Sequence, residues 1–383
     1  MLKILFLSPH RYTGTMSFAM ESIMSFGERG HFVDVVISSL AFPPVCFSNE
    51  NIQVYIFKEP KTLWRYTLLS FFRKTFMKVL SRKYDVIICL SEYSLLVGWI
   101  CYLIFKTRYV YYNDELHYGT ESKRKLGKIY GHFLKKLERI ACRYAIFTVT
   151  QDRLRGQELV KLNHISLDSI RYLPNSRCGN AEIKKSFYLH DKLGISRDIR
   201  IILWLGGALP GSGALELART AECWPSNCCI VYHFSRGQTD YIKRIRKYHA
   251  NGKVFVSIEP IAYEDVNKIV GSASIGLGLY SDEGKNVYLM GAASGKVNLF
   301  LQSGIPCIVN NYLGFRWVED NGAGLCIKNI SEVFDAAQKI FLDYKKYQER
   351  SVATFNGLLN YDKAYNTIAD ELEEIIKGKG RRE

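Results

Sequence analysis

Apolar and polar residues follow two successive series along the chain, in which short apolar runs alternate with longer stretches of mixed character. The short runs are nearly continuous in aliphatic and aromatic residues, which is typical of strands buried on both faces. The first series predicts strands at Lys3–Leu7, Val33–Ser38, Gln53–Phe57, Asp85–Leu90, Tyr109–Tyr112, Ala145–Thr150 and Ser169–Tyr172. The second predicts strands at Arg200–Leu205, Cys229–Phe234, Val254–Ile258, Ile275–Leu279, Cys307–Val309 and Gly324–Ile327. Helical stretches between such strands indicate an α/β fold with two parallel sheets.

The two series meet at a turn signal. Residues 173–176 (LPNS) end a strand and lead into a polar stretch that continues to Asp198. We therefore expect one domain over residues 1–176 and a second over residues 177–359, each of a size that can bury its own core. A last helical stretch, residues 360–383, has no strand after it.

The clearest chemical signal lies between Ser274 and Asn310, which read as a buried strand, a polar loop, a helix and a turn into another strand. The helix is opened by Ser294, Gly295 and Lys296. Free N–H groups and the positive end of the helix dipole attract anions at such a position, and Lys296 adds charge. Because parallel sheets bind ligands beyond the carboxyl ends of their strands, we expect a phosphorylated ligand here rather than a solvated lysine.

Two further segments follow predicted strands. Residues 206–213 (GGALPGSG) come after the first strand of the second domain and form either a flexible turn or a source of backbone N–H groups for an anion. Residues 113–117 follow strand Tyr109–Tyr112 and contain three titratable groups, Asp114, Glu115 and His117. Such clustering at the carboxyl end of a strand favours a functional site over a solvated loop.

Composition argues against a metal site, disulfides, a membrane-spanning segment and a signal sequence. The ten cysteines are scattered without a C-x-x-C pair, which favours reduced core thiols over a metal site or disulfides. The segment Val86–Phe105 is long enough to span a bilayer, but its one charge, Glu92, lies where a strand would end, and the remainder suits a buried helix. The N-terminal residues read as a strand rather than a signal sequence, so we expect a cytoplasmic protein.

Most of the net charge of +15 comes from two segments of the first domain. Residues 61–85 hold seven Lys or Arg against one acid, and residues 121–143 hold eight against two. Helical spacing in the first segment places an apolar stripe on one side and basic residues on the other: Leu69, Phe72, Phe76 and Val79 opposite Lys74, Lys78 and Arg82, with Trp64 and Phe71 among the basic residues. Aromatic residues within a basic face favour an anionic membrane surface over a merely solvated one. No nucleic-acid recognition motif accompanies the charge.

These features together resemble the GT-B glycosyltransferases: two Rossmann-like domains, a Pro174–Asn175 hinge, the Ser294–Lys296 helix start before the turn at Gly304, and a final helix. The resemblance is greatest to the retaining branch, family 4-like and of the bacterial polysaccharide type. It implies two Rossmann-like domains facing across a cleft, with the nucleotide sugar on the second, the acceptor on the first, and helix 360–383 crossing back to the first.

The resemblance also implies roles for residues. Lys296, eight residues before Gly304, takes the place of a lysine that faces the donor. Gly14 and Thr15 represent a turn that approaches the sugar or diphosphate, and Asn113 to His117 lie where relatives place polar groups against the transferred sugar. Two glutamates of the family pattern are replaced by Gly291 and Leu299.

Substitutes for the missing groups are available nearby. Asn298, Ser294 or Glu283 could bind the ribose hydroxyls in place of the lost carboxylate, although Glu283 and Asp282 could equally form a polar turn. The glycine segment lacks the basic residues that bind diphosphate in relatives, and Arg236, after strand Cys229–Phe234, is the nearest cation. The implied donor-binding residues are Gly14, Thr15, Gly206, Gly207, Arg236, Glu283, Ser294, Gly295, Lys296 and Asn298.

The sequence therefore predicts a glycosyltransferase, peripheral at the inner face of the membrane, that moves a sugar from a nucleotide sugar to a lipid-linked or polysaccharide acceptor. Asp114, Glu115 or His117 would act on the acceptor hydroxyl, and Lys296 on the leaving diphosphate. No cofactor or metal is expected, since no D-x-D follows a strand. A nucleotide-sugar epimerase and a non-catalytic GT-B partner subunit remain alternatives, whereas a dinucleotide oxidoreductase would need a G-x-G-x-x-G after the first strand.

Overall fold

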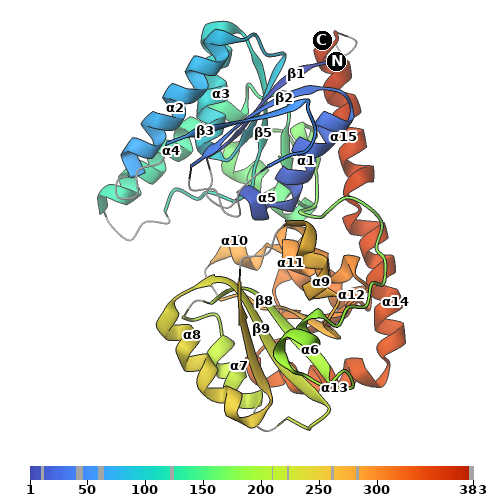
Figure 1. The fold of residues 1–383 in the computed structure, drawn as a ribbon. Helices are drawn as coiled ribbons and strands as arrows, with labels where there is room; N and C mark the ends of the chain where they lie inside the picture. Colours follow the sequence, from blue (N-terminus) through green and yellow to red (C-terminus); the bar gives the residue numbers. More distant parts are fainter. Residues whose placement is uncertain are drawn as a thin grey trace. The chain divides into compact units, whose positions relative to one another are not determined.

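The computed structural model describes residues 1–9, 13–39, 46–58, 64–120, 125–208, 210–221, 224–259, 263–281 and 284–378. The chain divides into two compact units (Figure 1). One consists of Met1–Arg177 with Tyr361–Glu383, and the other of Cys178–Asn360. Each unit is a parallel sheet covered by helices on both faces. The division lies next to Ser176, where the turn signal placed the domain boundary, and the last helix belongs to the first unit.

The first unit contains a seven-stranded parallel sheet with strand order β3-β2-β1-β4-β5-β6-β7. Its strands are β1 (Lys3–Ser8), β2 (Phe32–Ser38), β3 (Ile52–Phe57), β4 (Val86–Leu90), β5 (Arg108–Tyr112), β6 (Thr148–Thr150) and β7 (Ile170–Tyr172). All seven strands predicted from the apolar runs are confirmed, and β6 is shorter than expected.

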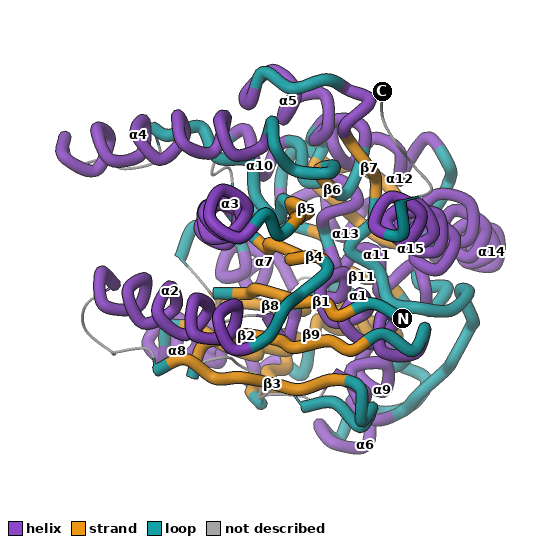
Figure 2. Tube along the Cα trace, turned by 90° about the horizontal axis from the view of Figure 1, so that it is seen from above, coloured by secondary structure: helices purple, strands orange, loops and turns teal. Residues whose placement is uncertain are grey.

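Helices cover both faces of this sheet. The helices α2 (Trp64–Ser81), α3 (Glu92–Phe105) and α4 (Lys125–Cys142) lie side by side on one face, with α5 (Arg153–Asn163) beside α4 (Figure 2). The helices α1 (Ser17–Glu28) and α15 (Tyr361–Ile376) pack against each other on the other face. The apolar segment 86–105 is thus a strand followed by a helix, and none of the helices in the described ranges is both long and apolar enough to cross a membrane.

The second unit contains a six-stranded parallel sheet with strand order β10-β9-β8-β11-β12-β13. Its strands are β8 (Arg200–Ala208), β9 (Cys228–Gly237), β10 (Val254–Ile258), β11 (Ile275–Gly278), β12 (Cys307–Asn310) and β13 (Gly324–Ile327). These strands again confirm the predicted series.

Alternate residues of β8 point into two separate apolar layers. Ile202 and Trp204 pack with α7 (Ala214–Thr220), α8 (Thr239–Arg246) and α13 (Val333–Leu342). Ile201 and Leu203 pack with the other face, whose helices are α6 (Tyr188–Leu193), α9 (Val266–Val270), α11 (Gly295–Gln302) and α12 (Arg316–Asp320). A sheet buried on both faces in this way explains why its strands are nearly continuous apolar runs.

Helix α2 is rotated relative to the orientation expected from the sequence. Phe71, expected on an exposed basic face, is fully buried, and Leu69, expected in the buried stripe, is 65% exposed. The nitrogens of Lys78 and Arg82 lie 3.8 Å and 3.2 Å from the carboxylate of Asp34, a buried residue of β2. A buried carboxylate needs compensating charge, so both basic groups point toward Asp34, although 42% of the Arg82 side chain stays exposed. The predicted basic face of α2 is therefore wrong, and the side chain of Trp64 lies outside the described structure.

Candidate active site

Lys296 lies in the first turn of α11, close to the carboxyl end of β11. Its Nζ donates a hydrogen bond to the carbonyl oxygen of Leu279 at 2.9 Å and lies 3.9 Å from the centroid of the Tyr280 ring. Burial lowers the pKa of Lys296 to about 7. The ammonium is thus packed among protein groups at the carboxyl edge of the sheet instead of extending freely into solvent.

Tyr280 links the strand to the start of this helix. Its hydroxyl lies 2.5 Å from Ser294 Oγ, and its backbone N–H donates to Asn310 Oδ1 at 2.7 Å. Ser294 is the N-cap residue of α11, and its side chain accepts a hydrogen bond from the N–H of Val297. This arrangement confirms the helix start predicted at Ser294–Lys296, and it adds Tyr280, which the sequence alone did not single out.

Asn298 and Glu283 were proposed as substitutes for the missing glutamate, and Leu299 stands at its position in the sequence. Asn298 is buried and donates from Nδ2 to the carbonyl of Ala292 at 2.8 Å, which supports the turn that precedes α11. Leu299 packs in the apolar core of the unit. Glu283 lies outside the described residues. A ribose contact by Asn298 or Glu283 therefore stays a prediction.

The glycine segment begins within the sheet rather than after it. Strand β8 continues through Ala208, and its register with β9 shifts between Gly206 and Gly207. Gly206 has a φ of 131°, which a residue with a side chain rarely adopts. Gly207 pairs with Arg236 across this irregularity, so the structure brings these two candidate positions together at the backbone level. The side chain of Arg236 is not part of the described structure.

A small cavity opens at the same edge of the sheet. Its volume is about 150 Å³, and residues of the segments that follow β8, β11, β12 and β13 line it, including Ser212, Tyr280 and Lys328. Within the described residues, the buried Oγ of Ser212 has no hydrogen-bond partner. Small-molecule sites usually measure 300–1,000 Å³, so this cavity suits a group of phosphate size rather than a whole nucleotide sugar. The sequence analysis named the backbone of segment 206–213 but predicted a role for neither the Ser212 hydroxyl nor Lys328.

On the first unit, the loop after β5 is anchored by Asn113. This residue is fully buried, and its Nδ2 donates to the hydroxyl of Tyr111 at 2.9 Å and to the carbonyl of Glu115 at 2.8 Å. Its own carbonyl accepts a hydrogen bond from Nε2 of Gln151 at 2.8 Å. Asn113 therefore fixes the path of the loop that carries Asp114, Glu115 and His117.

His117 faces a carboxylate that the sequence did not identify as part of the site. Its Nε2 lies 3.3 Å from Oε1 of Glu92, the first residue of α3. Glu92 is buried, whereas 29% of the His117 side chain is exposed. A buried carboxylate at this distance orients the imidazole, and a histidine oriented in this way can serve as a general base. Parallel pairing of β4 with β5 brings these residues together.

Arg155 is a second residue that the sequence did not single out. It lies in the first turn of α5, is 1% exposed, and donates from Nη2 to the carbonyl of Asp114 at 2.8 Å. Burial lowers the pKa of Arg155. Its guanidinium holds the backbone of the loop after β5 at Asp114, so we regard it as a positioning residue.

The turn containing Gly14 and Thr15 precedes helix α1. Thr13–Thr15 form a single 3₁₀ turn in which Gly14 is buried, and the hydroxyls of Thr13 and Ser8 lie 2.6 Å apart. The backbone N–H of Phe18, the second residue of α1, donates to Oδ1 of Asn175 at 3.0 Å. Contact of Gly14 or Thr15 with a donor remains a prediction.

Metal-binding clusters are absent from the described ranges: no group of three or more His, Cys, Asp or Glu side chains there could hold an ion. The nine cysteines within those ranges are all free, and most are buried. The expectation of metal-independent catalysis stays a prediction.

Comparison with known proteins reveals likeness in structure rather than in sequence. No family model matches the chain, and no curated protein sequence matches it either. Sucrose-phosphate synthase from Thermosynechococcus elongatus matches with a TM-score of 0.74 at 14% identity, covering 98% of this chain and 100% of the other. HepE from Anabaena, solved in complex with UDP-glucose, matches with a TM-score of 0.73 at 14% identity over 98% and 100% of the two chains.

The chain has the GT-B fold.

Other GT-B neighbours point the same way. WaaG, a glycosyltransferase involved in lipopolysaccharide biosynthesis, matches with a TM-score of 0.68 at 13% identity over 98% of this chain and 100% of the other. A putative UDP-N-acetylglucosamine 2-epimerase from Listeria monocytogenes matches with a lower TM-score of 0.64 at 12% identity, over 100% and 98% of the chains. The fold is thus shared by transferases and by an epimerase, so the two activities can be distinguished only from the residues of the site.

Proposed function

We propose that this GT-B protein is a glycosyltransferase that moves a sugar from a nucleotide sugar to a lipid-linked or polysaccharide acceptor. The observation that carries the proposal is the ammonium of Lys296, held at the carboxyl end of β11 by the Leu279 carbonyl and the Tyr280 ring. A preorganised cation at a helix start stabilises the charge that develops on a departing diphosphate. The UDP-glucose complex of HepE supports a UDP-sugar donor. Retention of configuration, and a hexose as the transferred sugar, belong to the same proposal.

On the first unit, we assign the acceptor hydroxyl to His117. Among the three candidates of the β5 loop, His117 has a buried carboxylate, Glu92, within 3.3 Å of its ring. A base so oriented takes the hydroxyl proton as the new glycosidic bond forms on the face from which the diphosphate departs, which retains the configuration, and the diphosphate leaves with the electron pair of the old bond. Asn113 and Arg155 position this loop through hydrogen bonds to the carbonyls of Glu115 and Asp114.

Association with the inner membrane face is also proposed. Exposed apolar side chains lie on three neighbouring helices of the first unit, between basic residues of segments 61–85 and 121–143: Leu69, Met77 and Leu80 on α2, Leu103, Ile104 and Phe105 on α3, and Ile129, Tyr130 and Phe133 on α4. Apolar groups within a basic surface favour anionic lipid.

A nucleotide-sugar epimerase is the second candidate, favoured by the Listeria neighbour. It would release a free epimerised nucleotide sugar without needing an acceptor. A non-catalytic GT-B subunit is the third, because Gly291 and Leu299 stand where the resemblance places glutamates. It would bind a nucleotide sugar weakly or not at all and would not turn it over.

A nucleotide-sugar panel tests the proposal. We expect one donor to raise the melting temperature of the full chain, since a ligand at about 100 times its Kd stabilises the native state by about 2.7 kcal/mol. That donor is then incubated with lipid-linked and glycan acceptors, with and without EDTA, and we expect transfer in both. Release of an epimer identifies the epimerase, and absence of binding and turnover identifies the partner subunit. Loss of transfer in EDTA that magnesium or manganese restores would refute metal independence.

A further inference from the structure

The second unit has another cavity at the opposite edge of its sheet from Lys296. It measures about 460 Å³ and is lined by residues at the start of β8, before β11 and before β12, among them Arg200, Ser274 and Ile305. All strands of this sheet run parallel, so these residues lie at its amino edge. Ser274 in this lining and Leu279, whose carbonyl accepts a hydrogen bond from Lys296, are five residues apart along the chain, which is roughly 16 Å of extended strand at about 3.3 Å per residue. The cavity is therefore separate from the candidate donor site.

Basic side chains dominate this cavity. Four of its lining residues are cationic and one is acidic: Lys184, Lys185, Arg197 and Arg200 against Asp198. The Nζ of Lys185 lies 4.8 Å from the centroid of the Phe187 ring, and the guanidinium carbon of Arg200 lies 4.6 Å from that of Phe341. Among the described residues, neither cation has a carboxylate within ion-pair distance. Two cations flanked by aromatic rings thus remain available to pair with an anionic ligand.

A buried histidine in the same lining has an unused nitrogen. His190 is 5% exposed, and its Nε2 lies 3.0 Å from the carbonyl oxygen of Ile199. A carbonyl only accepts hydrogen bonds, so Nε2 carries the proton and Nδ1 is an acceptor in the neutral ring. Within the described part of the chain, Nδ1 has no hydrogen-bond partner. A buried acceptor of this kind fits a donor such as a hydroxyl group.

We propose that this cavity binds a small phosphorylated sugar or polyol. Its phosphate pairs with Lys185 and Arg200, one of its hydroxyls donates to Nδ1 of His190, and the ring of Tyr344 packs against its carbon skeleton. The volume of about 460 Å³ lies within the usual range of small-molecule sites. Neither the glycosyltransferase proposal nor the residues at the donor edge are needed for this inference.

Ribose 5-phosphate is a suitable probe, with ribose and inorganic phosphate as its two fragments. Isothermal titration of the full chain is expected to show saturable binding of ribose 5-phosphate that is stronger than that of either fragment. Lys185→Gln combined with Arg200→Gln is expected to weaken binding about tenfold or more, because charge-assisted contacts to phosphate are lost. Lys268→Gln, which changes an exposed lysine of the same unit outside the cavity, is the matched control and is expected to bind normally.

Each remaining outcome contradicts the proposal. Absence of binding to the wild-type chain refutes the site, and undiminished binding by the double variant with an unchanged melting temperature refutes its location. Equal affinity for inorganic phosphate refutes the hydroxyl contact with His190. Loss of binding in Lys296→Met would show that the probe occupies the donor edge instead. That variant is otherwise expected to bind ribose 5-phosphate normally, even if the proposed transferase activity proves wrong.

Discussion

Lys296 owes its chemistry to the groups packed around it. Its ammonium lies 3.9 Å from the centroid of the Tyr280 ring and 5.7 Å from that of Trp204, and both aromatic faces attract a cation. Burial opposes the charge and lowers the pKa of Lys296 from 10.5 to about 7. The charge needed at the diphosphate is therefore present at acidic and neutral pH and is lost as the pH rises.

We predict that donor affinity weakens as the pH rises through 7. In the unliganded protein at pH 8, about one tenth of Lys296 keeps its proton, so the donor should bind about tenfold more weakly than at pH 6. Isothermal titration with the donor found by the nucleotide-sugar panel measures this between pH 6 and 8.5. Lys296→Met should bind weakly at every pH and reduce kcat/KM by about two to three powers of ten.

Stability provides the second readout for this lysine. Because the pKa is lower in the folded chain, the buried ammonium makes folding less favourable below about pH 7, and this penalty fades between pH 7 and 10.5. The melting temperature of Lys296→Met at pH 7 should therefore not fall. Lys346→Met, at an exposed lysine of α14 (Tyr344–Thr354), should change neither quantity. A pH-independent donor affinity in the wild type would contradict the assignment.

The Glu92–His117 pair leads to a prediction about kcat. Glu92→Gln keeps the size of the side chain but cannot stabilise a protonated imidazole, so kcat should fall about a hundredfold with little change in donor KM. His117→Ala should cost at least as much. The double variant should resemble His117→Ala, because residues that act as a unit are not additive.

Glu28→Gln, at an exposed acid of α1 in the same unit, is the control for this pair. Steady-state kinetics with the identified donor and acceptor measure all four variants. Additive losses in the double variant would show that Glu92 and His117 act separately. A raised KM with normal kcat would show that they only bind substrate.

At the scale of elements, strands were easier to predict than helix orientation. Strands such as β4 and β12 are buried on both faces, so their composition alone identifies them. Helix α2 carries apolar residues on more than one side, since Phe71 is buried whereas Leu69 and Met77 are exposed. What decides its rotation is Asp34, a buried acid on β2 that attracts Lys78 and Arg82. That contact depends on tertiary packing and leaves no local pattern.

The candidate site divides in the same way. The start of α11 could be predicted because Ser294, Gly295 and Lys296 are consecutive and carry the N-cap pattern. The pairing of Glu92 with His117 could not, because it depends on β4 lying next to β5 in the sheet. Arg155 read as an ordinary helical arginine, and only its burial reveals that it holds the loop after β5.

The corrected orientation of α2 changes the membrane prediction. Exposed Arg73, Lys128 and Lys136 lie near the exposed apolar side chains of α2 and α4, whereas Lys78 and Arg82 are engaged with Asp34. Each basic residue near an anionic surface contributes about 1 kcal/mol. Changing Arg73, Lys128 and Lys136 to Glu should therefore abolish sedimentation with phosphatidylserine vesicles and leave the melting temperature nearly unchanged.

The same charge change elsewhere is the control for this experiment. Lys243, Lys268 and Lys346 of the second unit are 69%, 65% and 69% exposed, and their change to Glu should preserve vesicle binding. Equal loss in both triple variants would mean that net charge alone matters. Absence of wild-type binding would mean that the basic surface is only solvated.

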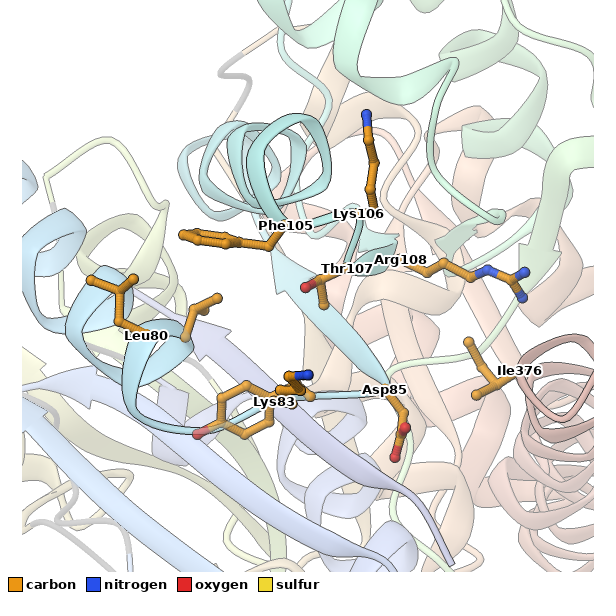
Figure 3. Close-up of a pocket in the computed structure, with 10 residues that line it drawn as sticks. Leu80, Lys83, Asp85, Phe105, Lys106, Thr107, Arg108 and Ile376 are labelled. Carbon is orange, nitrogen blue, oxygen red and sulfur yellow. The ribbon is translucent and has the colours of Figure 1, made fainter.

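The first unit also has a cavity, at the amino edge of its sheet. It measures about 540 Å³ and is lined by Lys83, Asp85, Phe105 and Arg108 among others (Figure 3). Asp85 Oδ2 accepts the backbone N–H of Lys3 at 2.7 Å, and Arg108 donates to the carbonyl of Ile375 at 2.8 Å. These polar groups join the first strand and the last helix to the sheet, which indicates a structural role.

At the scale of the whole chain, α15 returns to the first unit after the chain has formed the second. Ion pairs between residues far apart in the sequence hold it there. Arg29, which follows α1, pairs with Asp370 and Glu373, and Arg171 of β7 pairs with Glu371. The sequence pattern predicted a helix in this segment but contained no information on these partners, which lie in the first half of the chain.

Glu373 provides the test of this attachment. Burial alone would raise its pKa, but hydrogen bonds from Lys377, Arg29 and His31 lower the pKa of Glu373 to about 2. Because the unfolded value is 4.5, the ionised group stabilises the fold above pH 4.5, and this contribution is lost as the pH falls from 4.5 towards 2. Glu373→Gln should therefore lower the free energy of unfolding at pH 7 by about 1 kcal/mol after screening by solvent.

Urea unfolding of the two chains between pH 3 and 7 measures this contribution. The difference between wild type and Glu373→Gln should be constant from pH 7 to about 5 and should narrow below pH 4.5, because the carboxylate then takes up a proton in the unfolded wild type while it stays ionised in the folded chain. Glu374→Gln changes the adjacent, exposed acid and should have little effect at any pH. If the difference in unfolding free energy between wild type and Glu373→Gln stayed unchanged down to pH 3, or if the two variants had equal effects, the ion pairs of Glu373 would not hold α15 on the first unit.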